Sequence, residues 1–220
     1  MTQPKEVVIY GAGGFGREVA WLVSQCNIQE KPTYDIKCFI DDNQANYNRA
    51  INGIPVFSLD AAYNLYPGAF VLGGVGGPKV RRFLMEKAAK RGFRFESVIH
   101  PRIERSEWIE IGEGVLICAG NILTTNIVLA DHVQINLDCT IGHDVTIGEY
   151  GTLAPGVHIS GCVRIGKGAY IGTGAVVING TPDNPLTIGD DAVIGAGACV
   201  TKSVPAGITV VGVPAKPLQR

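Results

Sequence analysis

The most constraining feature of this chain is an aliphatic residue that recurs at every sixth position. The register runs from Ile111 to Val177, and every position in it is Ile, Leu or Val. An amphipathic helix repeats every 3.6 residues and a half-buried strand every 2, so a period of six requires a backbone that turns a corner every six residues. The pattern therefore predicts a parallel β-helix. Its positions are Ile111, Ile117, Leu123, Leu129, Ile135, Ile141, Ile147, Leu153, Ile159, Ile165, Ile171 and Val177.

Two further positions of the repeat carry residues that fit a narrow triangular core. The residue after the aliphatic one is often small, as at Gly112, Gly142, Gly148, Ala154, Gly166 and Gly172. The residue four places on is usually small or β-branched, as at Val133, Cys139, Val145, Val157, Val163 and Ala175. A coincidental run of short strands in a β-sandwich is the alternative, but such strands have no reason to hold one register.

The repeat is interrupted once and then resumes. It skips from Val177 to Ile188 and continues at Ile194 and Val200, which leaves five extra residues. The segment 179–186 carries the Gly, Pro and Asn of a protruding loop, so we expect the coil to bulge at one corner. Loops of this kind usually lie beside a binding surface.

The composition argues against nucleic acid and against membrane insertion. The formal net charge is −1, charged residues make up 18 % of the chain, and no basic run appears. The first residues lack a basic segment followed by an apolar stretch, and nowhere do 18 apolar residues run together. We therefore expect a cytoplasmic protein.

The cysteines are scattered singly, without C-x-x-C spacing. This arrangement favours reduced, mostly buried thiols over disulfides or a zinc site. The residues are Cys26, Cys38, Cys118, Cys139, Cys162 and Cys199.

The N-terminal part opens with a glycine-rich turn between a strand and a helix. Residues 7–10 form a short apolar strand, residues 11–16 read G-x-G-x-x-G, and an apolar-periodic helix follows from Arg17 to Val23. In this setting the glycines allow the backbone to approach a ligand, and the N–H groups at the helix start attract phosphate oxygens.

A second strand and a second glycine turn complete a small α/β unit. Residues 37–40 predict a strand that ends in Asp41 and Asp42, where a Rossmann-type unit places a carboxylate on a ribose or a base. Residues 69–72 predict a third strand that runs into the glycine-rich segment 73–77, and a helix follows over 78–91, with Phe83, Leu84 and Ala88 as its buried positions. A last short strand over 97–99 leads to a domain boundary at His100.

The unit is half the length of a full dinucleotide fold, which favours a nucleotide or nucleotide sugar over NAD. The chain then consists of a half-Rossmann βαβ domain at 1–100 and a β-helix at 101–220. By itself a G-x-G-x-x-G motif is a weak signal, and a purely structural role for these glycines stays open.

The histidines do not converge on one metal ion within one chain. Counted from Ile111 in coils of eighteen residues, His132, His143 and His158 fall at different corners or faces. We therefore expect no metal site, because a metal needs several ligands at one point.

His143 is the candidate general base. It lies two residues after Ile141, where the coil turns outward, and Asp144 follows it directly. A carboxylate can orient an imidazole and stabilise its protonated form after proton uptake. A surface histidine on a polar corner is the alternative, because neighbouring residues need not hydrogen-bond each other.

Several segments together resemble one family. These are the hexapeptide repeat, the closing sequence V-G-V-P-A-K at 211–216, the N-terminal I-Y-G-A-G-G-F-G, the F-I-D-D segment and the H-D pair. In these features the whole chain resembles the bacterial acyltransferases related to sialic acid O-acetyltransferase and UDP-4-amino-sugar N-acetyltransferase.

The resemblance implies a left-handed β-helix, a homotrimer with active sites between neighbouring β-helices, and acetyl-CoA as co-substrate. It implies transfer of an acetyl group to the 4-amino group of a nucleotide-linked 4-amino-4,6-dideoxy sugar. His143 would be the general base, Asp144 would orient it, and the Gly161 N–H would face the thioester oxygen. The other implied contacts are Asn136 near the amine; Gly172, Thr173, Ala196 and Gly197 along the pantetheine; Lys202 and Lys216 at the CoA phosphates; and Gly11, Gly13, Gly14, Gly74, Asp41 and Asp42 on the nucleotide sugar.

Three departures from the family pattern bear on the substrate. Phe15 stands where some members carry a histidine that reaches the diphosphate, so backbone groups or Arg17 would take that contact. Thr152 stands where the amino-sugar enzymes carry a second histidine near the acetyl group. The insertion at 179–186 borders the expected CoA groove.

Three other functions stay open at this point. O-acetylation of sialic acid or another free sugar would not need the nucleotide cleft at 11–16. A non-catalytic, nucleotide-binding trimeric scaffold would not bind CoA. An NAD oxidoreductase rests on the glycine motif alone. The sequence leaves the nucleotide, the sugar stereochemistry and the acyl group unassigned.

Overall fold

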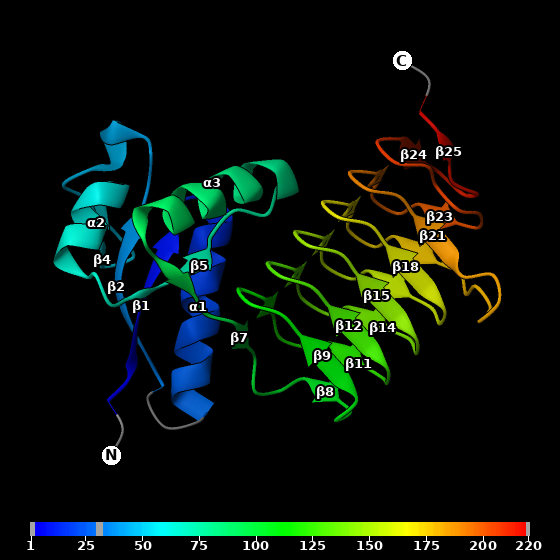
Figure 1. Cartoon of the computed structure of the whole chain (residues 1–220), viewed down its shortest axis with the longest axis horizontal. Helices are drawn as coiled ribbons and strands as arrows, with labels where there is room; N and C mark the ends of the chain where they lie inside the picture. The colour runs from blue at the N-terminus through cyan, green and yellow to red at the C-terminus, as the bar shows by residue number, and fades with distance from the viewer. Residues whose placement is uncertain (1–2, 30–32, 219–220) are drawn as a thin grey trace. The chain divides into compact units, whose positions relative to one another are not determined.

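The computed structural model describes residues 3–29 and 33–218. The chain forms two compact units, Met1–Pro101 and Arg102–Arg220. Figure 1 labels the elements of both units. In the described ranges, no helix is both long and apolar enough to cross a bilayer.

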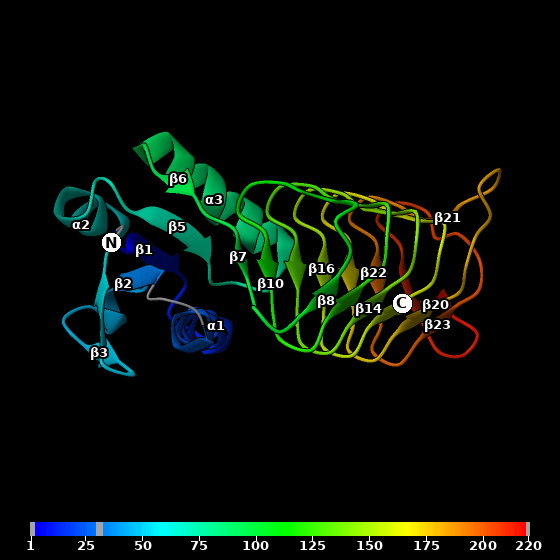
Figure 2. The ribbon, with the colours of Figure 1, turned by 90° about the horizontal axis from the view of Figure 1, so that it is seen from below.

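The first unit is a mainly parallel sheet with helices on both faces. Its strand order is β3-β4-β2-β1-β5-β6, and Figure 2 shows α1 on one face and α2 and α3 on the other. The last four residues of β1 are at most 1 % exposed, as expected for a central strand covered on both sides. The elements are β1 (Lys5–Tyr10), α1 (Gly14–Gln29), β2 (Tyr34–Ile40), β3 (Ala50–Ile51), β4 (Ile54–Phe57), α2 (Leu59–Leu65), β5 (Phe70–Gly73), α3 (Pro78–Arg91), β6 (Arg94–Phe95) and β7 (Val98–Ile99).

Most of the elements predicted for this unit are present. The strands expected at 37–40 and 69–72 correspond to β2 and β5, and the helix expected over 78–91 is α3. Helix α1 begins at Gly14, three residues earlier than predicted. Helix α2 and the hairpin β3–β4 were not predicted, because seven helical residues and two short strands give too few turns to show a period.

One predicted core residue is wrong. The sequence pattern predicts a buried Phe83 in α3, but the residue is 62 % exposed. The buried face of the helix carries Arg81, Leu84, Met85 and Ala88 instead, at helical spacing. Phe83 points the other way, because one residue along a helix is a rotation of about 100°.

The second unit is a β-helix with three parallel sheets, one on each side of a triangular prism (Figure 1). Strands pair across eighteen residues, as in Ile135 with Leu153 and Ile141 with Ile159. Face 1 contains β10 (Leu116–Ile117), β13 (Gln134–Ile135), β16 (Thr152–Leu153), β19 (Tyr170–Ile171), β22 (Val193–Ile194), β24 (Thr209–Val211) and the antiparallel β25 (Lys216–Pro217). Face 2 contains β8 (Glu104–Arg105), β11 (Ile122–Leu123), β14 (Thr140–Ile141), β17 (His158–Ile159), β20 (Val176–Val177) and β23 (Cys199–Val200). Face 3 contains β9 (Ile109–Ile111), β12 (Ile127–Leu129), β15 (Val145–Ile147), β18 (Val163–Ile165) and β21 (Leu186–Ile188).

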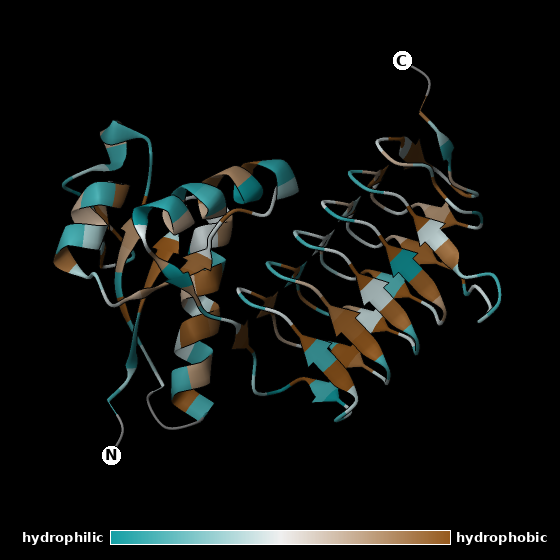
Figure 3. Ribbon diagram, viewed as in Figure 1, coloured by the Kyte–Doolittle hydropathy of each residue, from teal (hydrophilic) through white to brown (hydrophobic). Residues whose placement is uncertain are grey.

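The repeating aliphatic residues form the core of the prism. From Ile117 to Val200 they are at most 3 % exposed, and Val133, Val145 and Val157 four places on are completely buried. Figure 3 shows hydrophobic residues concentrated in the strands, with paler or hydrophilic corners between them. Only the first member, Ile111, is partly exposed, because it lies in the first coil of the stack.

The inserted loop is one residue shorter than expected. The sequence pattern predicts Leu186 in the loop, but the residue begins β21 and is 6 % exposed. The Leu186 N–H donates to Cys162 O at 3.1 Å, and the Gly180 N–H donates to Gly161 O at 3.0 Å. These two hydrogen bonds attach both ends of the inserted loop to the preceding coil.

The cysteines are free thiols, all buried except the partly exposed Cys199. Burial raises the pKa of Cys38 to about 12 and that of Cys139 to about 11. These two thiols therefore stay protonated and unreactive at neutral pH.

Candidate functional site

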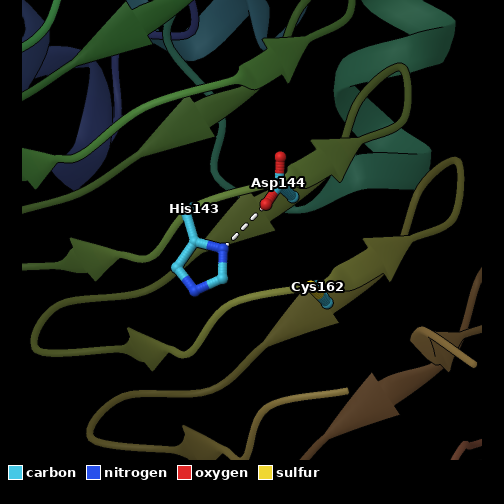
Figure 4. A group of neighbouring side chains, drawn as sticks. All are labelled: His143, Asp144 and Cys162. Atoms are coloured by element: carbon cyan, nitrogen blue, oxygen red, sulfur yellow. Dashed lines mark hydrogen bonds and ion pairs between the residues drawn. The ribbon is translucent and has the colours of Figure 1, made fainter. Parts of the chain in front are cut away.

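His143 and Asp144 form a hydrogen-bonded pair at the corner between faces 2 and 3 (Figure 4). His143 Nδ1 lies 2.8 Å from Asp144 Oδ2, and 60 % and 50 % of the two side chains are exposed. Asp144 has a positive φ of 57°, a conformation that Asp and Asn adopt more easily than most residues. This conformation turns the carboxylate back toward the preceding side chain, so the pair that the sequence predicted does interact.

Asn126 is a third member of this pair that the sequence analysis missed. Its Nδ2 donates to Asp144 Oδ1 at 3.1 Å. The hydrogen bond from His143 is the larger cause that holds the pKa of Asp144 below its usual value, and the bond from Asn126 is the second. Asn126 lies eighteen residues before Asp144, so the period of the coil could have identified it.

Gly161 lies directly under the imidazole, one coil after His143. A Cβ at this position would be 2.5 Å from His143 Cε1 and 2.9 Å from Cδ2, and it would also meet Nε2. Glycine is therefore required here to leave room for the ring. Gly161 is buried, and within the residues described its N–H donates to no acceptor.

Cys162 lies next to the pair. One ligand atom from each of His143, Asp144 and Cys162 falls within 4.8 Å of the others. The thiol belongs to a buried residue, whereas the other two are exposed and already bonded to each other. We assign no ion to this group, and the expectation of a metal-free site stays a prediction.

The other histidines do not join this corner. His132 is 8 % exposed at the corner between faces 3 and 1, and its ring stacks on Tyr150 with centroids 4.8 Å apart. His158 lies in β17 on face 2, where its Nδ1 is 2.8 Å from Thr140 Oγ1. His100 is buried in the first unit.

The predicted acetyl-CoA residues fall at two different corners of the prism. Lys202 follows β23 as His143 follows β14, so it shares the corner of His143 and Gly161. The residues at the corner between faces 1 and 2 are Asn136, Gly172, Thr173, Ala196 and Gly197, and Lys216 lies in β25. Face 2 therefore separates the two sets within one chain.

Lys202 lines a cavity formed by the inserted loop. The cavity has a volume of about 360 Å³, and Asn179, Thr181 and Ser203 also line it. No ion pair or hydrogen bond engages the Lys202 ammonium in the described part of the chain. The insertion thus adds a polar, cationic recess to the corner that carries His143.

In the first unit, the two glycine turns pack against each other. Gly11 has a φ of +116°, and a Cβ there would be 2.7 Å from Gly74 O. A Cβ added at Gly74 would likewise be 2.7 Å from Gly11 O. A Cβ on Gly13 would meet nothing, and one on Gly14 would meet only the tip of Arg17 at 4.0 Å. Gly11 and Gly74 are thus needed for packing, whereas Gly13 and Gly14 leave open space at the start of α1.

The two aspartates after β2 have different surroundings. Asp41 accepts the N–H groups of Ala12 and Asn43 at 3.3 and 2.8 Å, which ties the first glycine turn to the end of β2. Asp42 Oδ1 accepts from Tyr10 Oη at 2.9 Å and Lys87 Nζ at 2.8 Å, and its Oδ2 has no partner among the described residues. Asp42 is therefore freer than Asp41 to contact a ligand.

A cavity of about 510 Å³ adjoins Asp42, with Tyr47, Ser58, Lys87 and Lys90 in its lining. Tyr10 is 1 % exposed, and burial, followed by the bond to Asp42, raises its pKa far above the usual value. The phenol therefore stays protonated and donates to the carboxylate.

Arg81 supports the second glycine turn from inside the unit. The side chain is 1 % exposed, and its Nη1 donates to Val75 O at 3.0 Å and Gly76 O at 2.8 Å. The sequence analysis did not identify it, because an arginine in a charged helix is normally a surface residue.

Comparisons with known proteins agree with this arrangement. The family profile described as the PglD N-terminal domain matches residues 6–88. A GDP-perosamine N-acetyltransferase of Escherichia coli O157:H7 is 36 % identical over 213 residues, which cover 96 % of this chain and 96 % of that protein.

Solved structures match the whole chain. A perosamine N-acetyltransferase mutant from Caulobacter crescentus, in complex with CoA and GDP-perosamine, has a TM-score of 0.87 at 30 % identity, covering 98 % of this chain and 97 % of that one. WeeI from Acinetobacter baumannii AYE has a TM-score of 0.86 at 41 % identity, covering 97 % of this chain and 100 % of that one. The acetyltransferase domain of PglB from Neisseria gonorrhoeae FA1090, in complex with acetyl coenzyme A, has a TM-score of 0.86 at 34 % identity, covering 98 % and 100 %. With a PglD-type first unit, a left-handed β-helix and relatives that match over nearly the full length, the chain belongs to the hexapeptide-repeat family of bacterial sugar N-acetyltransferases.

Proposed function

We propose that this protein transfers the acetyl group of acetyl-CoA to the 4-amino group of a nucleotide-linked 4-amino-4,6-dideoxy sugar. The observation that carries the proposal is the 2.8 Å bond between His143 Nδ1 and Asp144 at an exposed corner. Gly161 lies against the ring, and its N–H donates to no acceptor among the described residues. The relatives named for GDP-perosamine support the same substrate class.

The reaction needs one base and one oxyanion donor. As the sugar amine attacks the thioester carbonyl, His143 Nε2 accepts a proton from the nitrogen, and Asp144 holds Nδ1–H and stabilises the imidazolium. The Gly161 N–H donates to the developing oxyanion. When the tetrahedral intermediate collapses, the C–S bond breaks and the imidazolium returns its proton to the CoA thiolate. The transfer is direct and forms no acyl-enzyme.

The first unit would hold the nucleotide. The open Gly13 and Gly14 lie at the positive end of the α1 dipole, where backbone N–H groups attract a diphosphate, and Arg17 is exposed beside them. Asp42 Oδ2 is the free acceptor for a sugar hydroxyl or a base N–H. GDP-perosamine is the first substrate to test, because relatives are named for it.

Acetyl-CoA would extend along the corner from His143 to Lys202. These residues lie three coils apart, and strands in neighbouring coils are spaced by about 4.8 Å, which gives a separation of about 14 Å. That span matches an extended pantetheine arm, with the thioester at His143 and a phosphate at Lys202. The cavity of the inserted loop would enclose the nucleotide end of the cofactor.

We infer that the active protein is a homotrimer in the cytoplasm. Gly172, Thr173, Ala196 and Gly197 lie across face 2 from His143 in the same chain, so a second copy is needed to bring such a corner to the cofactor. Three prisms packed corner to corner would provide three equivalent grooves. Acetyl-CoA and nucleotide sugars are metabolites of the cytoplasm, which fits that location.

The test is thiol release from acetyl-CoA with a panel of amines. We expect rapid release with GDP-perosamine or another nucleotide-linked 4-amino sugar, an N-acetylated product by mass spectrometry, and little release with free sialic acid. Release with sialic acid but with no nucleotide-linked amine would overturn the proposal in favour of O-acetylation. Binding of a nucleotide sugar without CoA binding at millimolar concentration would favour a scaffold.

A further inference from the structure

The corner that carries the catalytic pair contains a column of side chains along the axis of the β-helix. Asn126, Asp144 and Cys162 follow one another at intervals of eighteen residues and have φ values of 54°, 57° and 56°. The same backbone conformation in neighbouring coils points these side chains along one line. Asn126 and Asp144 therefore meet although they belong to different coils.

The contacts of Asn126 are confined to this column. Its side chain is exposed, and in the described part of the chain its bond to Asp144 Oδ1, at 3.1 Å, is the one hydrogen bond that the side chain makes. The backbone already joins the two coils here, because the Asp144 N–H donates to Thr125 O at 3.2 Å. The amide is thus not required to hold the corner together.

We propose that Asn126 is a positioning residue for the acetyl transfer, acting on His143 through Asp144. This inference rests on the proposed function of His143. The amide engages Oδ1, which leaves Oδ2 to accept Nδ1–H of His143 at 2.8 Å. That second bond fixes the tautomer in which Nε2 is unprotonated and can accept a proton.

The residue type at position 126 fits this role. A side chain there must tolerate a positive φ, which favours Asn, Asp or Gly. Asp would place a second carboxylate against Asp144, and Gly would offer no donor. Asn tolerates the positive φ and donates a hydrogen bond to Asp144 without adding charge.

The experiment is a double-mutant cycle with Asn126→Gly, Asp144→Asn and the combined variant. Glycine tolerates the positive φ, so the change removes the amide without straining the corner. We expect Asn126→Gly to lower kcat on the order of tenfold. The magnitude is taken by analogy from metal sites, where removing a residue that orients a histidine costs about 10- to 100-fold. The loss should vanish in the Asp144→Asn background, because the amide has no carboxylate left to hold. Asn52→Gly, another exposed Asn with positive φ, is the matched control and should leave kcat unchanged.

A second readout separates this inference from the proposed function. In the protein with ¹⁵N-labelled histidine, the His143 Nδ1–H proton should resonate far downfield and lose intensity in Asn126→Gly, with or without turnover. A fully active Asn126→Gly, or equal losses of activity in both Asp144 backgrounds, refutes the role of Asn126. An inactive wild-type protein with an intact Nδ1–H signal instead refutes the proposed reaction and leaves the positioning contact in place.

Discussion

Replacing Gly161 by alanine should displace the imidazole of His143. The added Cβ would be 2.5 Å from Cε1 and closer still to Nε2, whereas ordinary contacts begin at 3.4 Å, so the ring must retreat by at least about 0.9 Å. A misplacement of about 1 Å at a reacting group costs roughly 100-fold in rate. We therefore expect kcat to fall by about two orders of magnitude. The backbone N–H is retained in alanine and Gly161 does not have a positive φ, so neither a lost oxyanion donor nor backbone strain explains the loss.

The assay is steady-state thiol release with GDP-perosamine, together with thermal unfolding and a crystal structure of the variant. Gly68→Ala is the control, because a Cβ there meets nothing within 4 Å and the residue has no positive φ. We expect Gly68→Ala to keep full activity and Gly161→Ala to keep its fold. A Gly161→Ala protein with more than half of the wild-type kcat would show that the position of the ring is not critical.

Three further predictions concern the base, the glycine turn and the cofactor. His143→Ala should lower kcat/KM by 10²- to 10⁴-fold in the thiol-release assay, and retention of more than about a tenth places the base elsewhere. Arg81→Met removes the guanidinium that donates to two carbonyls of the second glycine turn, so unfolding by denaturant should show a loss of about 1–3 kcal/mol. KM should rise for the nucleotide sugar but not for acetyl-CoA. Lys202→Ala should raise KM for acetyl-CoA with little change in kcat, and an unchanged KM removes Lys202 from the cofactor site.

The pH at which Asp144 takes up its proton should depend on Asn126. The pKa of Asp144 lies below its usual value because His143 and, second, Asn126 donate to it, so the carboxylate stays charged to lower pH than a free aspartate. Cys162 is the other titratable group beside it. Asn126→Gly should move the protonation of Asp144 toward higher pH, as followed by carboxyl NMR. Stabilisation from the ionised carboxylate is lost as the pH falls through its folded pKa, so the variant should lose it at a higher pH than the wild type.

Much of the candidate site could be read from the sequence because the β-helix repeats locally. A corner after every six residues places His143 outward, and its neighbour Asp144 is within reach by covalent connection alone. The strand-turn-helix setting of the glycines likewise needs only adjacent residues. These features depend on periodicity and on short spacing, which a single sequence displays directly.

What the sequence analysis missed depends on contacts between coils and between helix faces. Phe83 is exposed against expectation and Arg81 is buried, because the direction of α3 against the sheet decides which face is buried. The separate roles of Asp41 and Asp42 depend on which backbone groups approach each carboxylate.

The sequence by itself determined the β-helix, because a strict period leaves the backbone few alternatives, and it predicted His143 and Asp144 as candidate partners without settling whether they bond. Only the tertiary structure decided that the Asn126 amide donates to Asp144 and that Gly161 makes room for the ring. Those relations depend on side-chain direction between coils eighteen residues apart, where small changes in backbone angle decide which groups meet.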